Sequence, residues 1–236
     1  MVFQLDSGIW FPDPHLAEDD GLLALGGDLS VDRLLLAYDY GIFPWYSFRD
    51  SDEIAWYCPH ERFVIFPDEI HISHSMRTLL NHTSSWLTPR KDARYRLTIN
   101  KDFEGVISNC SKLRYEEQGA WLGEDMIAAY TKLHQLGYAM SVEVWEVNAA
   151  EASNEEPPHD RLVGGLYGVA VGKSFIGESM FSLVPSGSKL ALIYLAQMLG
   201  RRGGGLIDCQ LHTPHLQSMG GRYIDYETYL KVLHAK

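Results

Sequence analysis

The sequence predicts an α+β protein with a small, loop-rich N-terminal domain, residues 1–70, and a larger domain, residues 71–236. The larger domain is expected to hold a mixed, largely antiparallel sheet with packed helices. Two observations lead to this prediction. The first seventy residues are dense in turn motifs such as FPDP, GGD and CPH, whereas strand-like and helix-like segments alternate from residue 138 onward. A chain of 236 residues with 46% hydrophobic residues can bury a core of this size.

The expected elements follow from local patterns. Ser30 precedes a helix predicted over residues 31–40, and Ser73 precedes one that runs to about residue 80. RLTI (96–99) is predicted as a strand, and helices are predicted near 102–110 and 124–136, the second of which shows apolar residues at helical spacing. Further strands are predicted at 138–147, 162–172, 174–182 and 205–210, with helices at 188–200, 215–219 and 226–233. The polar segment 148–160 is expected to be a mobile hairpin loop.

Composition excludes several classes of protein. There is no basic n-region followed by an apolar run, and no stretch approaches the ~20 apolar residues of a membrane span, so no membrane association is expected. The three cysteines, Cys58, Cys110 and Cys209, are far apart and odd in number, which favours neither a disulfide framework nor a CxxC metal site. The sequence therefore predicts a cytoplasmic location.

The net charge of −11 is distributed unevenly. Residues 1–70 hold fourteen Asp and Glu against three Arg, which accounts for the whole excess. By contrast, basic residues outnumber acidic ones between Trp86 and Arg114, where Arg90, Lys91, Arg94 and Arg96 lie close together. This basic run could meet a polyanion, or it could be an ordinary solvated loop.

The segment LIDCQLHTPHLQSM (206–219) contains Asp208, Cys209, His212 and His215, which invites a metal site or a cysteine nucleophile. Alternation along a strand places Asp208 and Gln210 on one face and Cys209 on the other, so Asp208 and Cys209 cannot easily bind one ion. The apolar neighbours of Cys209 favour an ordinary buried thiol. No metal is expected.

Three other features leave alternatives open. Glu178 lies in an otherwise apolar strand, where it either awaits a cationic ligand or forms an internal salt bridge. The loop aromatics, among them Phe43, Trp45 and Trp121, are either core or the walls of an apolar pocket. The glycine run after QMLGRR follows a helix instead of preceding one, which favours a helix C-cap over the phosphate loop of an acyl-CoA enzyme.

Taken together, these segments resemble the leucyl/phenylalanyl-tRNA protein transferases. The matching blocks occur in family order and span about residues 8–234: GLLALGGDLSVDRLLLAYDYGIFPWYS, IHISHSM, MIAAYTKLHQLGYAMSVEVWE, RLVGGLYGVAVGKSFIGESMFS, SKLALIYLAQML and LIDCQLHTPHLQSMG. The resemblance implies an acetyltransferase-like (GNAT-like) larger domain and no cofactor. It implies transfer of Leu or Phe, with Met as a further candidate, from aminoacyl-tRNA to proteins that begin with Arg or Lys. It also implies degradation of the modified proteins; a monomer is expected.

The resemblance places roles on individual residues. Glu178 matches the acidic residue that contacts the acceptor, and Asp208 and Gln210 match the pair that handles its α-amino group. The family's basic helix is reduced here to Arg77, so the run Arg90, Lys91, Arg94 and Arg96 is a candidate for tRNA phosphates. The implied pocket for the aminoacyl group and the terminal adenosine consists of Phe43, Trp45, Trp121, Leu166, Phe175 and Ile207.

A comparison of pKa values indicates separate roles for Asp208 and Gln210. A carboxylate with an ordinary Asp pKa near 3.9 is about four pKa units too acidic to take the proton of an α-amine. We therefore expect Asp208 to orient and polarise Gln210, and Gln210 to position the amine. Two alternatives remain: a degenerate module that only binds protein N-termini or RNA, and an acyl-CoA-dependent N-acetyltransferase.

Overall fold

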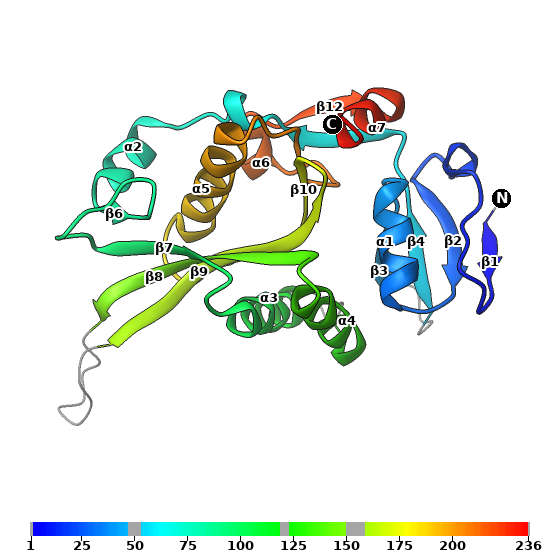
Figure 1. Cartoon of the computed structure of the whole chain (residues 1–236), viewed down its shortest axis with the longest axis horizontal. Coiled ribbons are helices and arrows are strands. Elements are labelled where there is room, and N and C mark those ends of the chain that lie inside the picture. Colours follow the sequence, from blue (N-terminus) through cyan, green and yellow to red (C-terminus); the bar gives the residue numbers. More distant parts are fainter. Residues whose placement is uncertain (1, 47–52, 119–122, 150–158, 236) are drawn as a thin grey trace.

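The structure is a computed structural model that describes residues 2–46, 53–118, 123–149 and 159–235. Two sheets lie side by side along the long axis of the molecule, each with its own helices (Figure 1). The α+β class and the mixed, largely antiparallel larger sheet, both predicted from the sequence, are confirmed. The predicted loop 148–160 lies mostly outside the described residues.

The small sheet has the order β1-β2-β4-β3, with β1 parallel to β2 and the other neighbours antiparallel. Its strands are β1 (Phe3–Leu5), β2 (Leu22–Gly26), β3 (Phe43–Tyr46) and β4 (Ile54–Tyr57), with a 3₁₀ turn η1 at Pro14–Leu16. Strands of three to five residues among many turns carry little periodic signal, and the sequence did not predict them. The predicted helix after Ser30 is present as α1 (Val31–Asp39).

The large sheet has eight strands in the order β12-β5-β11-β10-β9-β8-β7-β6. Only β10 with β11 and β6 with β7 are parallel pairs. The strands are β5 (Glu61–Ile65), β6 (Thr83–Ser84), β7 (Tyr95–Ile99), β8 (Ala139–Ala149), β9 (His159–Val171), β10 (Ser174–Ser182), β11 (Ile207–Asp208) and β12 (Arg222–Asp225). The long strands β8, β9 and β10 match the predicted segments, whereas β11 is much shorter than predicted.

Helices cover both faces of the large sheet (Figure 1). α5 (Gly187–Arg201) packs on β8, β9 and β10 from one side, while α3 (Phe103–Gln118) and α4 (Glu124–Gln135) cover the other side. The approach of α5 to β9 is close: a Cβ added at Gly164 would lie 2.9 Å from the backbone carbonyl carbon of Gly187, so glycine is required there. The remaining helices are η2 (Pro67–Glu69), α2 (His74–Asn81), α6 (Pro214–Ser218) and α7 (Tyr226–Leu233).

The change from one sheet to the other comes between Tyr57 and Glu61. β5 begins at Glu61 and pairs with β11 and β12 of the large sheet. The predicted division of the chain at residue 70 therefore falls after the first strand of the large sheet and stays a prediction about folding units. Within the described residues, no helix is both long and apolar enough to cross a membrane.

Candidate active site

A cavity of about 350 Å³ opens between α5, α6 and the strands β3, β9, β10 and β11. Its size falls within the range of small-molecule sites, roughly 300–1,000 Å³. The lining is mainly apolar, with polar residues from β10, from β11 and from the segment after β11. The apolar residues include Trp45, Leu166, Phe175, Leu192, Leu195 and Ile207, and the polar residues include Glu178, Asp208 and Gln210.

Four of the six aromatic and aliphatic residues expected in an aminoacyl pocket line this cavity: Trp45, Leu166, Phe175 and Ile207. Phe43 is not among the lining residues. Its ring is 1% exposed and lies against the guanidinium of Arg62, whose Cζ is 4.7 Å from the ring centroid. Trp121 lies outside the described residues.

Glu178 enters the cavity at an irregularity in β10. The pairing of β10 with β9 shifts between Gly177 and Ser179, so Glu178 has no partner in the strand register. Its carboxyl group is buried, and it accepts hydrogen bonds from the hydroxyls of Tyr38 (2.8 Å) and Tyr130 (2.9 Å). Gln210 Nε2 donates to the same carboxyl at 3.2 Å.

No ion pair between described residues includes Glu178, so the expected alternative of an internal salt bridge is wrong for this part of the chain. Burial raises the pKa of Glu178 to about 7, although the hydrogen bonds from Tyr38 and Tyr130 oppose the shift. Among the described residues, two tyrosines and an amide thus contact this carboxyl, and no cation does.

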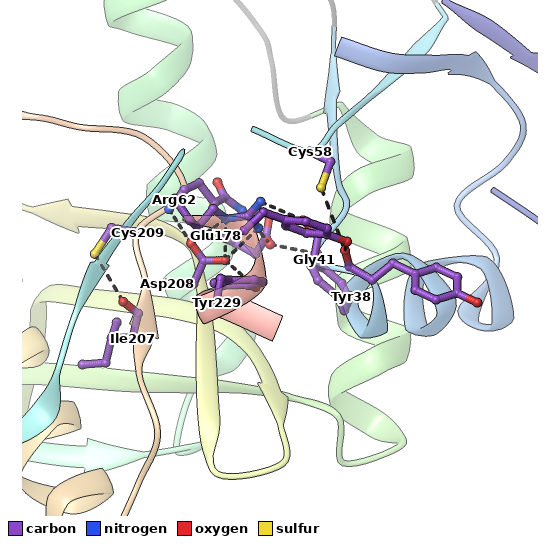
Figure 2. A network of polar contacts seen from close by, with 12 residues as sticks. Tyr38, Gly41, Cys58, Arg62, Glu178, Ile207, Asp208, Cys209 and Tyr229 are labelled. Atoms are coloured by element: carbon purple, nitrogen blue, oxygen red, sulfur yellow. Dashed lines mark hydrogen bonds and ion pairs between the residues drawn. The ribbon is translucent and has the colours of Figure 1, made fainter. Parts of the chain in front are cut away.

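Asp208 is the acceptor in a second buried cluster, which it forms with Arg62 and Tyr229 (Figure 2). Arg62 donates from Nε to both carboxylate oxygens, at 3.0 and 2.9 Å, and from an NH2 group to Oδ2 at 2.7 Å. Tyr229 donates its hydroxyl to Oδ2 at 2.9 Å. Arg62 and Asp208 are both fully buried, and the second guanidinium nitrogen of Arg62 donates to Gly41 O at 2.7 Å.

Gln210 follows the end of β11 and adopts a left-handed backbone conformation, with φ of 60°. The backbone N–H of Gln210 donates to Asp208 Oδ1 at 2.7 Å, while its side chain points to Glu178. The expectation that Asp208 polarises the amide of Gln210 is therefore wrong, because the carboxylate holds the backbone of Gln210 and not its side chain. The two residues adjoin through a tight turn and not through strand alternation.

Comparison with known proteins identifies the family of the chain. Residues 64–234 match the family model described as leucyl/phenylalanyl-tRNA protein transferase, and residues 27–60 match that of its N-terminal domain. The chain belongs to the leucyl/phenylalanyl-tRNA protein transferase family. Relatives of that name from Nitrosomonas eutropha and Flavobacterium johnsoniae are 45% and 42% identical, over 99% and 100% of this chain and 90% and 100% of theirs. A crystal structure of FemX is 11% identical with a TM-score of 0.49, covering 83% of this chain and 66% of that one.

In this transferase, neither Cys209 nor His212 has the contacts of a reactive centre. Cys209 Sγ lies 3.7 Å from Ile207 O, and burial raises the pKa of its thiol well above the usual range. His212 Nε2 lies 3.0 Å from Gln217 Oε1, and its ring stacks on Tyr223. Within the described ranges, no three His, Cys, Asp or Glu side chains are grouped to hold a metal ion.

The basic run of the transferase divides into two parts. Arg94 pairs with Glu146 at 3.3 Å, and Arg96 pairs with Asp160 at 2.5 Å. Arg90, Lys91 and Arg77 of α2 are exposed. The glycine run is a helix C-cap as predicted, because α5 ends at Arg201 and Gly203 follows with φ of 63°.

Four residues of the two polar clusters were not predicted from the sequence: Tyr38, Arg62, Tyr130 and Tyr229. A signal existed for Arg62, because a basic side chain within the apolar strand ERFVI must find a buried partner. The three tyrosines carried no such signal, since each lies on an apolar helix face where a phenylalanine would fit the pattern equally well.

Proposed function

We propose that this transferase moves a leucyl or phenylalanyl group from its tRNA ester to the α-amino group of proteins that begin with Arg or Lys. Membership of the family and the names of the relatives support the aminoacyl donor and the protein acceptor. The observation that carries the proposal is the cavity, in which an apolar wall faces a buried carboxyl and an amide.

The apolar wall suits the donor end of the reaction. Trp45, Leu166, Phe175 and Ile207 would surround the leucyl or phenylalanyl side chain and the terminal adenosine. Aromatic and branched side chains stabilise such groups through burial, at ~25 cal/mol per Å² of apolar surface removed from water. They also offer a flat aromatic face, Trp45, to a base.

The polar side suits the acceptor end. Glu178 would place a carboxyl beside the basic N-terminal residue, which favours Arg or Lys and disfavours Asp or Glu. Gln210 would position the α-amine, because its Nε2 already points to Glu178 and its amide oxygen can accept a hydrogen bond from the amine. Asp208 would hold the backbone of Gln210 in the required conformation.

The reaction is the aminolysis of an ester. The nitrogen of the α-amine attacks the aminoacyl carbonyl, a C–N bond forms, and the 3′ oxygen of the tRNA leaves with a proton. With an α-amino pKa of about 7.7 to 8.0, formation of the neutral amine costs only ~1 kcal/mol at neutral pH. Much of the acceleration would therefore come from holding an activated ester against the amine.

The tRNA body would contact the exposed basic residues. Arg77, Arg90 and Lys91 are the better candidates for phosphates, because Arg94 and Arg96 already pair with Glu146 and Asp160. We further propose that the transferase acts in the cytoplasm as a monomer and that its products are directed to degradation.

The test supplies radiolabelled Leu-tRNA or Phe-tRNA and an Arg-initiated peptide to the purified full chain. We expect label in the peptide, and little or none in a matched peptide that begins with Glu. No transfer from Leu-, Phe- or Met-tRNA would refute the proposal. Peptide binding without transfer would instead support a binding module, and acetyl transfer from acetyl-CoA would support an acetyltransferase.

A further inference from the structure

We propose that Trp86 stacks on an unpaired base of the aminoacyl-tRNA, next to phosphates that Arg90 and Lys91 neutralise. The inference rests on the proposed function, because it takes the tRNA donor as the ligand. It places a base contact on a surface that is separate from the cavity.

Trp86 stands out by its exposure. Its side chain is 64% exposed, more than any other large apolar side chain that the structure describes. Single exposed apolar residues are common on protein surfaces, so exposure alone does not indicate a ligand. The way in which Trp86 is held and the charges around it do.

A tight turn between β6 and β7 presents Trp86 to solvent. The N–H of Ser85 donates to Thr88 O at 3.2 Å, and the N–H of Thr88 donates to Ser85 Oγ at 3.2 Å. Leu87, the next residue in the chain, packs against one of the two apolar cores, whereas Trp86 faces outward. An aromatic ring on such an ordered turn loses little conformational entropy when it binds a partner.

Unpaired basic residues accompany the turn. The N–H of Arg90 donates to Ser84 Oγ at 3.0 Å, which holds the backbone of Arg90 beside β6. Arg90, Lys91 and Arg77 of α2 are exposed, and none of the three forms an ion pair with another described residue. An exposed aromatic ring within a cationic surface is the combination that binds single-stranded nucleic acid.

The distribution of charge favours a polyanion at this end of the molecule. Residues 1–57, which contain the strands of the small sheet, hold eleven Asp and Glu against two Arg. Residues 71–101 hold six Lys and Arg against Asp92 alone. The small sheet lies at one end of the long axis, and α2 and β6 lie at the other (Figure 1). Repulsion at the first end and attraction at the second would orient a bound tRNA.

The turn also lies within reach of a tRNA whose 3′ end occupies the cavity. Thr88 lines the same surface depression as Ala196 of α5, while Leu192 and Leu195 of that helix line the cavity. The turn and the cavity therefore flank one helix, and an α-helix with its side chains is about 10–12 Å across. A tRNA strand that leaves the cavity across α5 would meet Trp86 after a few nucleotides.

The test measures binding of leucine tRNA without its amino acid to the full chain at several salt concentrations. Trp86→Ala should weaken binding by about tenfold, within the roughly 5- to 150-fold loss expected when a stacked aromatic ring is removed. The slope of log K against log salt should not change, because no charge is removed. Trp86→Phe keeps a ring and should restore much of the affinity.

Trp10→Ala is the matched control. Trp10 is also exposed, at 39%, but it belongs to the acidic end of the molecule, so its removal should leave tRNA affinity unchanged. In transfer to an Arg-initiated peptide, Trp86→Ala should raise the KM for Leu-tRNA by about the same factor as it weakens binding. Its kcat should stay nearly constant, because the turn lies outside the cavity.

Unchanged tRNA affinity in Trp86→Ala, or a loss equal to that of Trp10→Ala, would overturn the inference. A change of oligomeric state in Trp86→Ala with tRNA affinity intact would overturn it as well, and would assign Trp86 to contact with a second copy of the chain. An unaltered chain that binds tRNA through Trp86 but transfers no amino acid would refute the proposed function alone.

Discussion

Arg62→Met tests how much the buried pair of Arg62 and Asp208 contributes to the stability of the protein. The substitution keeps an unbranched side chain against Phe43 and Tyr229 but removes every hydrogen bond to Asp208 and Gly41 O. Asp208 would be left as a buried charge with Tyr229 and the N–H of Gln210 as its partners. Removal of one member of a buried pair costs about 3–5 kcal/mol.

Such a loss is large beside a typical total stability of about 5–15 kcal/mol. For a chain of this size it corresponds to a Tm lower by roughly 6–20 °C. Urea unfolding followed by tryptophan fluorescence would measure it. The matched control is Arg94→Met, because Arg94 and Glu146 form an exposed pair that should contribute less than about 1 kcal/mol.

A double-mutant cycle isolates the pair. Asp208→Asn removes the charge that Arg62→Met leaves unpaired, so the double variant should be destabilised by less than the sum of the two single changes, with a coupling of roughly 2–3 kcal/mol. Equal losses of stability for Arg62→Met and Arg94→Met, or additivity in the cycle, would refute the view that the buried pair stabilises the protein more than the exposed pair does.

Two further predictions concern transfer and tRNA binding. Gln210→Ala should lower the rate of transfer to an Arg-initiated peptide far more than Cys209→Ala, since the side chain of Gln210 contacts Glu178 whereas the thiol of Cys209 packs against apolar residues and lies 3.7 Å from Ile207 O; similar losses would contradict this. Charge reversal of Arg90 and Lys91 should reduce the slope of log K against log salt for tRNA binding by about one for each phosphate that is no longer neutralised. Reversal of Arg94 should change that slope less, because its charge is already paired with Glu146; an equal change would refute the division of the basic run.

Much of the fold could be predicted because long periodic segments carry a strong signal. The helix after Ser30, the strands β8 to β10 and the glycine cap after α5 all occur where patterns placed them. The small sheet escaped prediction since its strands are too short for alternation to be distinguished from turns. α3 also extends to Gln118, beyond the predicted end near residue 110.

The candidate site could be predicted only in part. Alternation led to Asp208 and Gln210, but β11 ends at Asp208, and a left-handed turn rather than a strand brings the two together. Glu178 stood out as a carboxyl among apolar residues, yet its tyrosine partners come from α1 and α4, far away in the sequence. Side-chain pairing across such separations depends on tertiary packing, which local patterns do not encode.

The position of Tyr229 has a consequence for folding during synthesis on the ribosome. This residue lies in α7, which follows β5 and β11 in the chain, and its hydroxyl completes the cluster around Asp208. Synthesis on the ribosome runs from the N-terminus, so Arg62 and Asp208 emerge before the residue that caps their cluster. A nascent chain would therefore complete this cluster only after α7 has followed β5 and β11 out of the exit tunnel.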